Sequence, residues 1–532
     1  MRNGALAAAA ALAALPAGAA GEVEARAALR LRATFLENAP AAEIRYDRDL
    51  RGFAVDGYLS PSQDDRFASA LVALALEGRH AEGRLRWALA VDSGQLRETR
   101  FPAIAPVCRA PTSPTGLTGC PAYAAHYLLD ETRPADPTLT SNGRPVAEEV
   151  EATVFLREAW LAGSFGRAGL ATVRAGRKRV VVGDGFVFDD YGTAAELSLD
   201  LGAAGPPFDL GVAVLHPSRD FPRAGDPLSP LLVLRADFLP SLFERAGLFA
   251  AALRDRSGSM GELFRSGIAE ALATRLAAEA LGSDRYKILS VALAETLSAR
   301  LESEATALWL GTSGSLSVGR GHRLSWTAAA MGGRVERVGR AGGATLAEDV
   351  RLRGKMASAR WESGIGERAV VSGEILYLSG SRPLTPTVEP GAEPGTVRVV
   401  PATGAYPGFL GISPFVTFTN LFFGGGLADS FDAREATAPG VNGRGVVAPA
   451  LGAVLDPRDG LSVEAKAAWL LADVAGPTGG RTYGTEVDLL LSWRPRDGVR
   501  LGLELDALFT GDFFPSAGPV YKGILALDLT TP

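Results

Sequence analysis

Basic side chains recur along the sequence, several of them at alternate positions of stretches that are otherwise apolar. A guanidinium group can bind a carboxylate through two parallel hydrogen bonds, and a row of basic groups attracts anions. The residues are Arg30, Arg32, Arg84, Arg86, Arg157, Arg174, Arg177, Lys178, Arg323, Arg351, Arg353 and Lys355. Their types and spacing predict the binding or passage of an anionic solute.

The sequence contains no arrangement that is typical of catalysis. Its four histidines, His80, His126, His216 and His322, are scattered, and none stands beside a cysteine, a second histidine or a Gly-x-Ser-x-Gly elbow. A hydrolase that uses a serine and one of these histidines is the enzymatic alternative. Gly183-Asp184-Gly185 offers too few ligands for a cation and indicates a turn. We therefore expect no enzyme activity, no cofactor and no metal.

The stretch 446–529 predicts the kind of element that carries the basic residues. It contains one turn sequence twice, as Asp456-Pro457-Arg458-Asp459-Gly460 and as Arg494-Pro495-Arg496-Asp497-Gly498. Proline presets φ, aspartate stabilises the turn and glycine accepts a positive φ, so each copy predicts a tight hairpin. Apolar and polar residues alternate on both sides of these turns, in runs of about ten residues that are typical of strands between lipid and a wet lumen.

Length and composition favour one large barrel. Residues 1–20 have a basic start, an apolar core and a small-residue exit, which predicts a secretory signal peptide. No later run of about 20 apolar residues could span a membrane as a helix. With 47% hydrophobic residues, 63 glycines and no dividing linker, residues 21–532 predict a single domain. The predicted fold is all-β, a transmembrane antiparallel β-barrel of about 18 strands, a size that leaves an aqueous channel.

Loop lengths predict the orientation of this barrel, because outer-membrane barrels have short periplasmic turns and longer outer loops. The turn near His80 and both Pro-Arg-Asp-Gly turns should face the periplasm, whereas 96–147, 257–303 and 380–442 should face outward. Within about 257–303 apolar residues fall at helical spacing, which predicts a helical insertion. We interpret it as a helical hairpin that covers the rim, with a lid or plug over the pore as the alternative.

Cysteine content and net charge indicate which bonds and binding partners to expect. Cys108 and Cys120 are the two cysteines, and export to an oxidising compartment favours a disulfide between them. Metal binding by the two thiols is the alternative. A net charge of −6 without a basic face predicts no binding of nucleic acid.

Three short motifs resemble the alginate-export family of outer-membrane barrels. They are Leu156-Arg157-Glu158-Ala159-Trp160, then Val173-Arg174-Ala175-Gly176-Arg177-Lys178, then Gly183-Asp184-Gly185. The run 415–423 also looks like a loop element of that family. Lys178 stands where the family has Gln, and the chain ends without an aromatic residue. The resemblance implies an arginine-rich pore that passes a polyuronate chain, with a periplasmic export scaffold as partner.

The sequence thus predicts an outer-membrane channel for an anionic polysaccharide or other anionic solutes, embedded in outer-membrane lipid. A general diffusion porin without polymer specificity is the alternative. Placing Arg or Lys on the lipid face near the midplane costs about 2–4 kcal/mol, so the basic residues should face the lumen. We expect two basic walls, with Arg323, Arg351, Arg353 and Lys355 opposite the others. Alternatively, the basic residues balance lumen acids, namely Glu196, Asp200, Glu374, Glu486, Asp488, Glu504 and Asp506.

Overall fold

The structure is a computed structural model. It describes residues 22–39, 43–47, 52–56, 63–80, 82–95, 107–108, 154–166, 169–202, 208–217, 229–238, 245–256, 260, 303–319, 321–341, 344–382, 384, 387–390, 397–412, 418–423, 436–437, 439–440, 443–476, 479–514 and 518–531. The predicted signal peptide at 1–20 and nearly all of the predicted helical insertion at about 257–303 lie outside these residues. Cys120 does too, so the disulfide with Cys108 stays a prediction.

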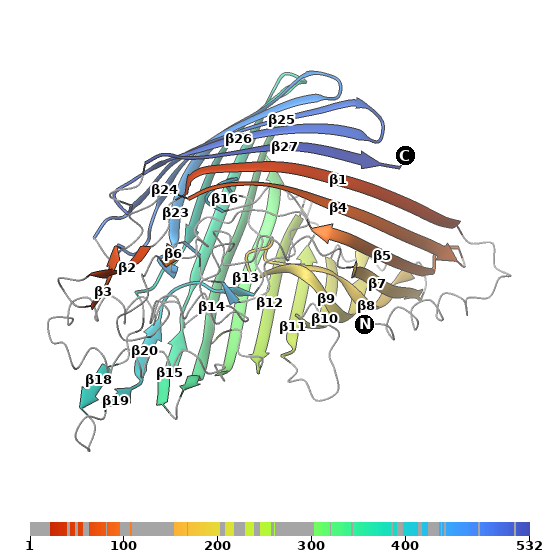
Figure 1. Ribbon diagram of the computed structural model, residues 1–532. Coiled ribbons are helices and arrows are strands. Elements are labelled where there is room, and N and C mark those ends of the chain that lie inside the picture. Colours follow the sequence, from red (N-terminus) through yellow and green to blue (C-terminus); the bar gives the residue numbers. More distant parts are fainter. Residues whose placement is uncertain are drawn as a thin grey trace.

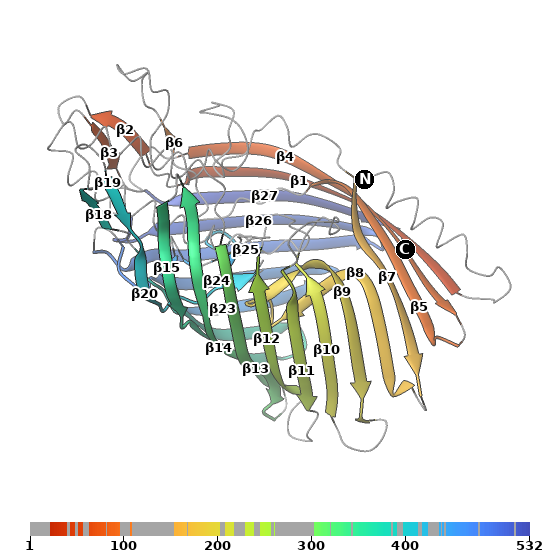
Figure 2. The ribbon, with the colours of Figure 1, turned by 90° about the horizontal axis from the view of Figure 1, so that it is seen from below.

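Within the described residues, one antiparallel sheet closes on itself as a barrel of 18 strands (Figures 1 and 2). This confirms the predicted fold class and strand number. In ring order the strands are β1 (Glu22–Ala39), β4 (Gln63–His80), β5 (Leu85–Gln95), β7 (Val154–Phe165), β8 (Ala171–Val182), β9 (Phe188–Asp200), β10 (Phe208–His216), β11 (Leu231–Phe238), β12 (Arg245–Asp255), β13 (Ser303–Ser317), β14 (His322–Ala341), β16 (Lys355–Ile365), β17 (Ala369–Leu378), β23 (Val446–Arg458), β24 (Leu461–Leu471), β25 (Thr482–Arg496), β26 (Val499–Thr510) and β27 (Val520–Thr530).

The first and last strands close the ring. β1 pairs with β27 from Ala28↔Thr530 to Glu37↔Tyr521, and it pairs with β4 on its other edge. In Figure 1 the red β1 lies beside the blue β27. Closure removes the unpaired sheet edges that a membrane would not tolerate.

Smaller strands add to this ring. β15 (Ala344–Leu352) pairs with the end of β14 and, in parallel, with β20 (Ala402–Tyr406). Short pairs or triplets complete the described strands: β2 (Glu43–Asp47), β3 (Gly52–Asp56) and β6 (Val107–Cys108); β18 (Thr387–Pro390) with β19 (Val397–Val400); and β21 (Gly411–Ile412) with β22 (Ala436–Thr437).

The chain is interrupted between β15, which ends at Leu352, and β16, which begins at Lys355. The interruption falls at Gly354, where a Cβ would lie 2.5 Å from the Cα of Phe409. Just before it, the backbone N–H of Arg353 donates to the carbonyl of Tyr406 at 2.9 Å. The backbone of 406–409 therefore lies directly against the chain at this point, and only a glycine fits there.

The repeated turn sequence closes two tight hairpins, as predicted. Gly460 and Gly498 have φ values of 78° and 77°, which L side chains rarely adopt. The antiparallel order places both turns, together with the turn 82–84, at one end of the barrel, which we call the short-turn end. The long connections leave the opposite end, the long-loop end. Which end faces the periplasm stays a prediction.

Large apolar side chains are exposed all around the outside of the barrel. Examples from widely separated strands are Leu74 at 54%, Leu248 at 55%, Leu451 at 72% and Leu525 at 61% exposure. Monomeric soluble proteins rarely expose apolar surface of this extent, whereas a lipid-facing barrel requires it. No helix among the described residues is long and apolar enough to span a membrane.

Candidate functional site

A row of basic side chains lies on the inward face of β1, β5, β7, β8 and β11. Residues opposite one another in an antiparallel pair share a face, and the alternate positions of these strands carry exposed apolar residues such as Leu31, Val173 and Leu234. The inward positions hold Arg30, Arg32, Arg86, Arg174, Lys178 and Arg235, and Arg157, at the bulge between Leu156 and Glu158, contacts the inward Asp92; we call these seven residues the basic row.

Carboxylates hold the ends of the basic row in place. Arg32, only 5% exposed, donates from Nη1 to Oδ1 of Asp528 on β27 at 2.6 Å. Glu196 on β9 accepts from two cations, Lys178 Nζ and Arg235 Nη2, the latter at 2.9 Å. A guanidinium has five donors, and one carboxylate engages at most two of them in bidentate form. These ion pairs therefore fix the direction of the basic groups without using all their donors.

The middle of the row is held by one acid and one aromatic ring. Arg157 Nη1 lies 3.6 Å from Oδ1 of Asp92, which is fully buried. The guanidinium of Arg174 stacks 4.7 Å above the ring centroid of Trp160, whose Nε1 donates to Glu158 at 2.9 Å. Stacking on an aromatic face restrains an arginine while leaving its edge available for hydrogen bonds.

Three other predicted site residues lie away from the basic row. Arg84 lies in the turn before β5, at the short-turn end. Arg177 is in register with Ala159 and Thr193, one residue off the positions of Arg174 and Lys178. Arg323 faces inward near the short-turn end, where its Nη2 lies 3.4 Å from Oγ of Ser315.

The second basic wall predicted from Arg351, Arg353 and Lys355 does not exist in the lumen. These three side chains are exposed, whereas the alternating Val350, Leu352 and Met356 are buried toward the interior. The prediction failed because the energetic penalty for an outward charge applies near the bilayer midplane. Lys355 begins β16, and Arg351 and Arg353 lie still closer to the long-loop end, beyond the apolar part of the outer face.

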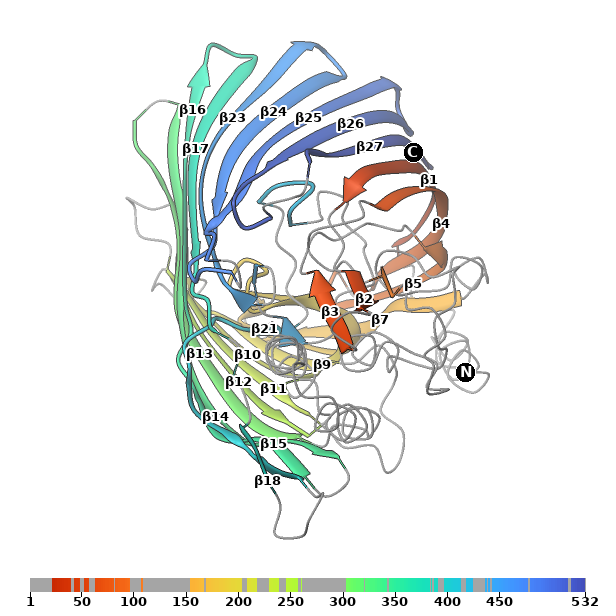
Figure 3. The same cartoon turned by 60° about the vertical axis from the view of Figure 1, so that its left-hand side comes forward.

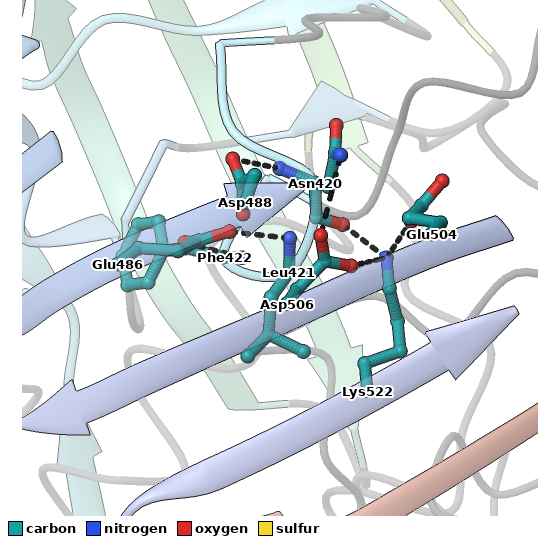
Figure 4. A network of polar contacts seen from close by, with 8 residues as sticks. All are labelled: Asn420, Leu421, Phe422, Glu486, Asp488, Glu504, Asp506 and Lys522. Atoms are coloured by element: carbon teal, nitrogen blue, oxygen red, sulfur yellow. Dashed lines mark hydrogen bonds and ion pairs between the residues drawn. The ribbon is translucent and has the colours of Figure 1, made fainter. Parts of the chain in front are cut away.

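The inward face of β25 and β26 is acidic and is covered by the chain itself (Figure 4). Glu486, Asp488, Glu504 and Asp506 lie on the inward face of β25 and β26 and are at most 5% exposed; we call them the acid cluster. Against them lie residues 418–423, which with 406–412 we call the inner segment. The inner segment comes from the long connection between β17 and β23.

Backbone N–H groups of the inner segment donate to the acid cluster. Glu486 accepts from the N–H of Leu421 at 2.6 Å and from that of Phe422 at 3.0 Å. Asp488 accepts from the N–H of Asn420 at 3.2 Å. Two carboxylates thus satisfy three consecutive backbone donors that would otherwise be buried without partners.

A buried lysine completes this network. Lys522 on β27 donates from Nζ to the carbonyl of Asn420 at 2.6 Å, to Glu504 at 2.7 Å and to Asp506 at 3.0 Å. The side-chain amide of Asn420 also lies 3.3 Å from Asp506. The charge of the acid cluster is therefore directed at the inner segment and at Lys522, whereas the basic row begins on β1, the strand next to β27, and continues to β11.

The inner segment is also held by the far side of the barrel. Trp309 on β13 donates from Nε1 to the carbonyl of Leu410 at 2.8 Å, and the N–H of Ile412 donates to the carbonyl of Val187 at 2.7 Å. Phe422 packs on Tyr483, with ring centroids 4.7 Å apart. Because β13 and β25 stand in different parts of the ring, the described portions of the inner segment lie within the barrel, as Figure 3 illustrates.

Gly183-Asp184-Gly185 forms the turn between β8 and β9 and folds toward β12 and β14. All three residues have positive φ, at 60°, 49° and 88°. Asp184 is hydrogen-bonded to Oγ1 of Thr327 on the inward face of β14, and a Cβ on Gly183 would lie 2.9 Å from the ring of Phe249 on β12. The turn therefore narrows the interior from the side opposite the acid cluster.

A carboxylate outside the spanning strands joins β25 to β26 at the long-loop end. Asp512 accepts from the backbone N–H groups of Thr482 at 2.6 Å and Arg481 at 2.9 Å. The Thr482 bond, followed by the Arg481 bond, lowers the pKa of the Asp512 carboxyl below its ordinary value.

We expect this contribution to stability to be present above the ordinary aspartate pKa of about 3.9 and to be lost as pH falls through the lowered folded-state pKa. At neutral pH, Asp512→Ala should accelerate hydrogen exchange at the amides of Arg481 and Thr482. The native protein should show the same acceleration only under acid conditions. Equal exchange in the variant and the native protein at neutral pH would contradict this role.

The acid cluster and the inner segment were not predicted as one unit. The acids were identified only as residues that balance lumen charge, and the run 415–423 only by resemblance to a loop element. A usable signal is the cluster of Phe418, Leu421, Phe422 and Phe423 in a long connection otherwise rich in Pro, Gly and Thr. Several large apolar side chains close together in an exposed loop would be costly, so they indicate a loop that turns inward.

Comparisons with known proteins give structural matches only. No family model matches the sequence, and a search of curated proteins finds no relative. The solved structures that match include OccK9 (OpdG) of Pseudomonas aeruginosa, with 12% identity, a TM-score of 0.46 and coverage of 96% of this chain and 98% of that chain. A BenF-like porin from Pseudomonas fluorescens Pf-5 has 11% identity, a TM-score of 0.43 and coverage of 96% and 99%.

OccAB1 of Acinetobacter baumannii has 10% identity, a TM-score of 0.46 and coverage of 97% of this chain and 98% of that chain. The closed barrel described above rests on its own strand pairings.

Proposed function

We propose that the chain forms an outer-membrane channel through which small anionic solutes diffuse. The observation that carries this proposal is the separation of charge inside the barrel. The basic row lines β1, β5, β7, β8 and β11, while the acid cluster across β27 binds the backbone of the inner segment. Anions that enter the interior therefore meet the guanidinium groups of the basic row, while the acid cluster is buried beneath the inner segment.

The outer face supports the membrane location. Exposed leucine, valine and tryptophan side chains surround the ring, and closure leaves no strand edge within it. Both features are what a β-barrel needs in lipid. Export through a signal peptide at 1–20 belongs to the same proposal.

The inner segment favours small solutes over a polymer. It is fixed to β13, to the β8–β9 turn and to β25–β27 by hydrogen bonds of 2.6–3.2 Å. A polyuronate chain would have to pass a segment held on both sides, whereas a small carboxylate needs only the part of the interior beside the basic row. A diffusion porin is therefore better supported than a polysaccharide exporter with a periplasmic scaffold.

The test is reconstitution of the mature chain in planar bilayers. A gradient of potassium chloride should give a reversal potential that corresponds to anion selectivity, and this selectivity should weaken as salt shortens the Debye length to about 3 Å at 1 M. Swelling of proteoliposomes should be faster with a small carboxylate than with an oligouronate of several residues. Cation selectivity would contradict the proposed anion channel, and equal rates for the two solutes would favour the exporter.

A further inference from the structure

An apolar hollow opens on the outer wall of the barrel, on the side of β14, β16, β17, β23 and β24. It measures about 630 Å³, and small residues form its floor, among them Ala359, Gly373 and Ala467. Trp361 and Trp469, 45% and 53% exposed, lie at its two sides. Figure 3 shows β16, β17, β23 and β24 side by side in this part of the wall. A hollow of this shape in a lipid-facing surface fits an acyl chain.

A cluster of exposed basic side chains lies above this hollow, toward the long-loop end. Lys355 lies on the same face of β16 as Ala359, four residues away, which corresponds to about 13 Å along a strand. Arg353 and Arg351 continue this outward alternation, and Arg334 on β14 is in direct register with Arg351. We call Arg334, Arg351, Arg353 and Lys355 the outer basic patch.

The close spacing of like charges in the outer basic patch favours the binding of an anion. Arg334 and Arg351 are directly opposite in the β14–β15 pair, and like charges at such positions destabilise a sheet. Asp349 compensates Arg334 through a 2.7 Å bond between Nε and Oδ1, and the exposed Glu336 and Glu348 lie farther from the hollow, where Glu348 is in register with Arg337. Arg351, Arg353 and Lys355 lie on the side of the patch nearer to the hollow. Phosphate oxygens are suitable partners for arginine forks and lysine.

We propose that this face is a binding site for one membrane lipid with a phosphate-bearing, net anionic headgroup. One acyl chain would occupy the hollow between Trp361 and Trp469, and the phosphate would lie against Arg351, Arg353 and Lys355. The inference goes beyond the channel function and uses none of its residues. It rests on the proposed membrane location alone.

The test measures lipid binding to the delipidated full chain in detergent by native mass spectrometry. Phosphatidylglycerol should bind at one saturable site at least about tenfold more tightly than phosphatidylcholine with the same acyl chains, because each basic group near a headgroup contributes favourably. In the triple variant Arg351→Ser, Arg353→Ser, Lys355→Ser, the affinity for phosphatidylglycerol should fall to that for phosphatidylcholine. Gly373→Leu, which fills the hollow, should weaken the binding of both lipids.

Two controls distinguish this site from a general attraction of lipid or phosphate to a basic surface. Replacing Arg458, Arg494 and Arg496 by Ser at the short-turn end removes the same number of charges and should leave binding unchanged. Inorganic phosphate should not compete at concentrations comparable to the lipid, because it has no acyl chain. Equal binding of the two lipids, full competition by phosphate, or an unaffected triple variant would overturn the proposal. Channel conductance should be unchanged in the triple variant, so a failure of the channel proposal would be seen separately.

Discussion

Replacing Arg86 and Arg174 by serine should lower the ratio of chloride to potassium permeability roughly threefold or more at low salt, because two fixed charges leave one side of a confined interior. Both residues are in register with Ala162 and face inward from β5 and β8. The change should shrink at 1 M salt, where the Debye length is about 3 Å. Reversal potentials in planar bilayers measure it, and unchanged amounts of heat-modifiable barrel show that folding is intact.

The matched control for this experiment comes from the outer basic patch. Arg351→Ser with Arg353→Ser removes two arginines from the outside of the same barrel and should leave the permeability ratio unchanged. If both double variants shifted selectivity equally, the effect would come from total charge rather than from the lumen. If neither did, the basic row would only balance lumen acids such as Glu196 and Asp528.

Alternation along the strands predicted both the barrel and the faces of its central strands. Val499 to Asp506 alternates over a long run, and the structure places Glu504 and Asp506 inward with Leu501 and Leu505 exposed. The alternation is reliable in these strands because apolar side chains must face the lipid and charged side chains must face the polar interior. The turn sequences were equally informative, since Gly460 and Gly498 must adopt positive φ.

The same rule failed where a strand leaves the apolar zone. Arg351, Arg353 and Lys355 alternate with apolar residues as regularly as Glu504 and Asp506 do, yet they point outward. Sequence alternation indicates that two faces differ, but it does not indicate the depth at which a residue lies. The depth of Arg351, Arg353 and Lys355 in the membrane is set by the length of β14 and by the pairing of β15 with β20. Neither feature can be read from the local sequence.

The contact between the inner segment and the acid cluster could not be predicted, because it joins residues that are distant in sequence. Leu421 and Glu486 are 65 positions apart, and Asn420 and Lys522 are 102 apart. Periodicity identified Glu486 and Asp488 as inward acids, but it carries no information about which loop returns to them. Because this network is buried, we assign its acids a structural role, and the basic row remains part of the charged lining of the interior.

Releasing the inner segment should change conductance more than any single charge change in the basic row. In Glu486→Ala with Asp488→Ala, the N–H groups of Asn420, Leu421 and Phe422 lose their carboxylate acceptors, and leaving a buried donor unsatisfied costs about 1–3 kcal/mol each. We expect residues 418–423 to leave the β25–β26 wall. Single-channel recordings should then show a larger and noisier conductance, and swelling assays should admit bulkier solutes.

The control is Glu464→Ala, which removes a carboxylate that precedes the inward Lys466 by two positions on β24, near the short-turn end. It should leave conductance and its noise unchanged, because the inner segment does not depend on it. Glu486→Gln with Asp488→Asn should fall between the native protein and the alanine pair, since each amide keeps one oxygen acceptor. If the alanine pair conducted as the native barrel does, the inner segment would not limit passage, and the limiting contact would lie instead at the Gly183–Gly185 turn and its bond to Thr327.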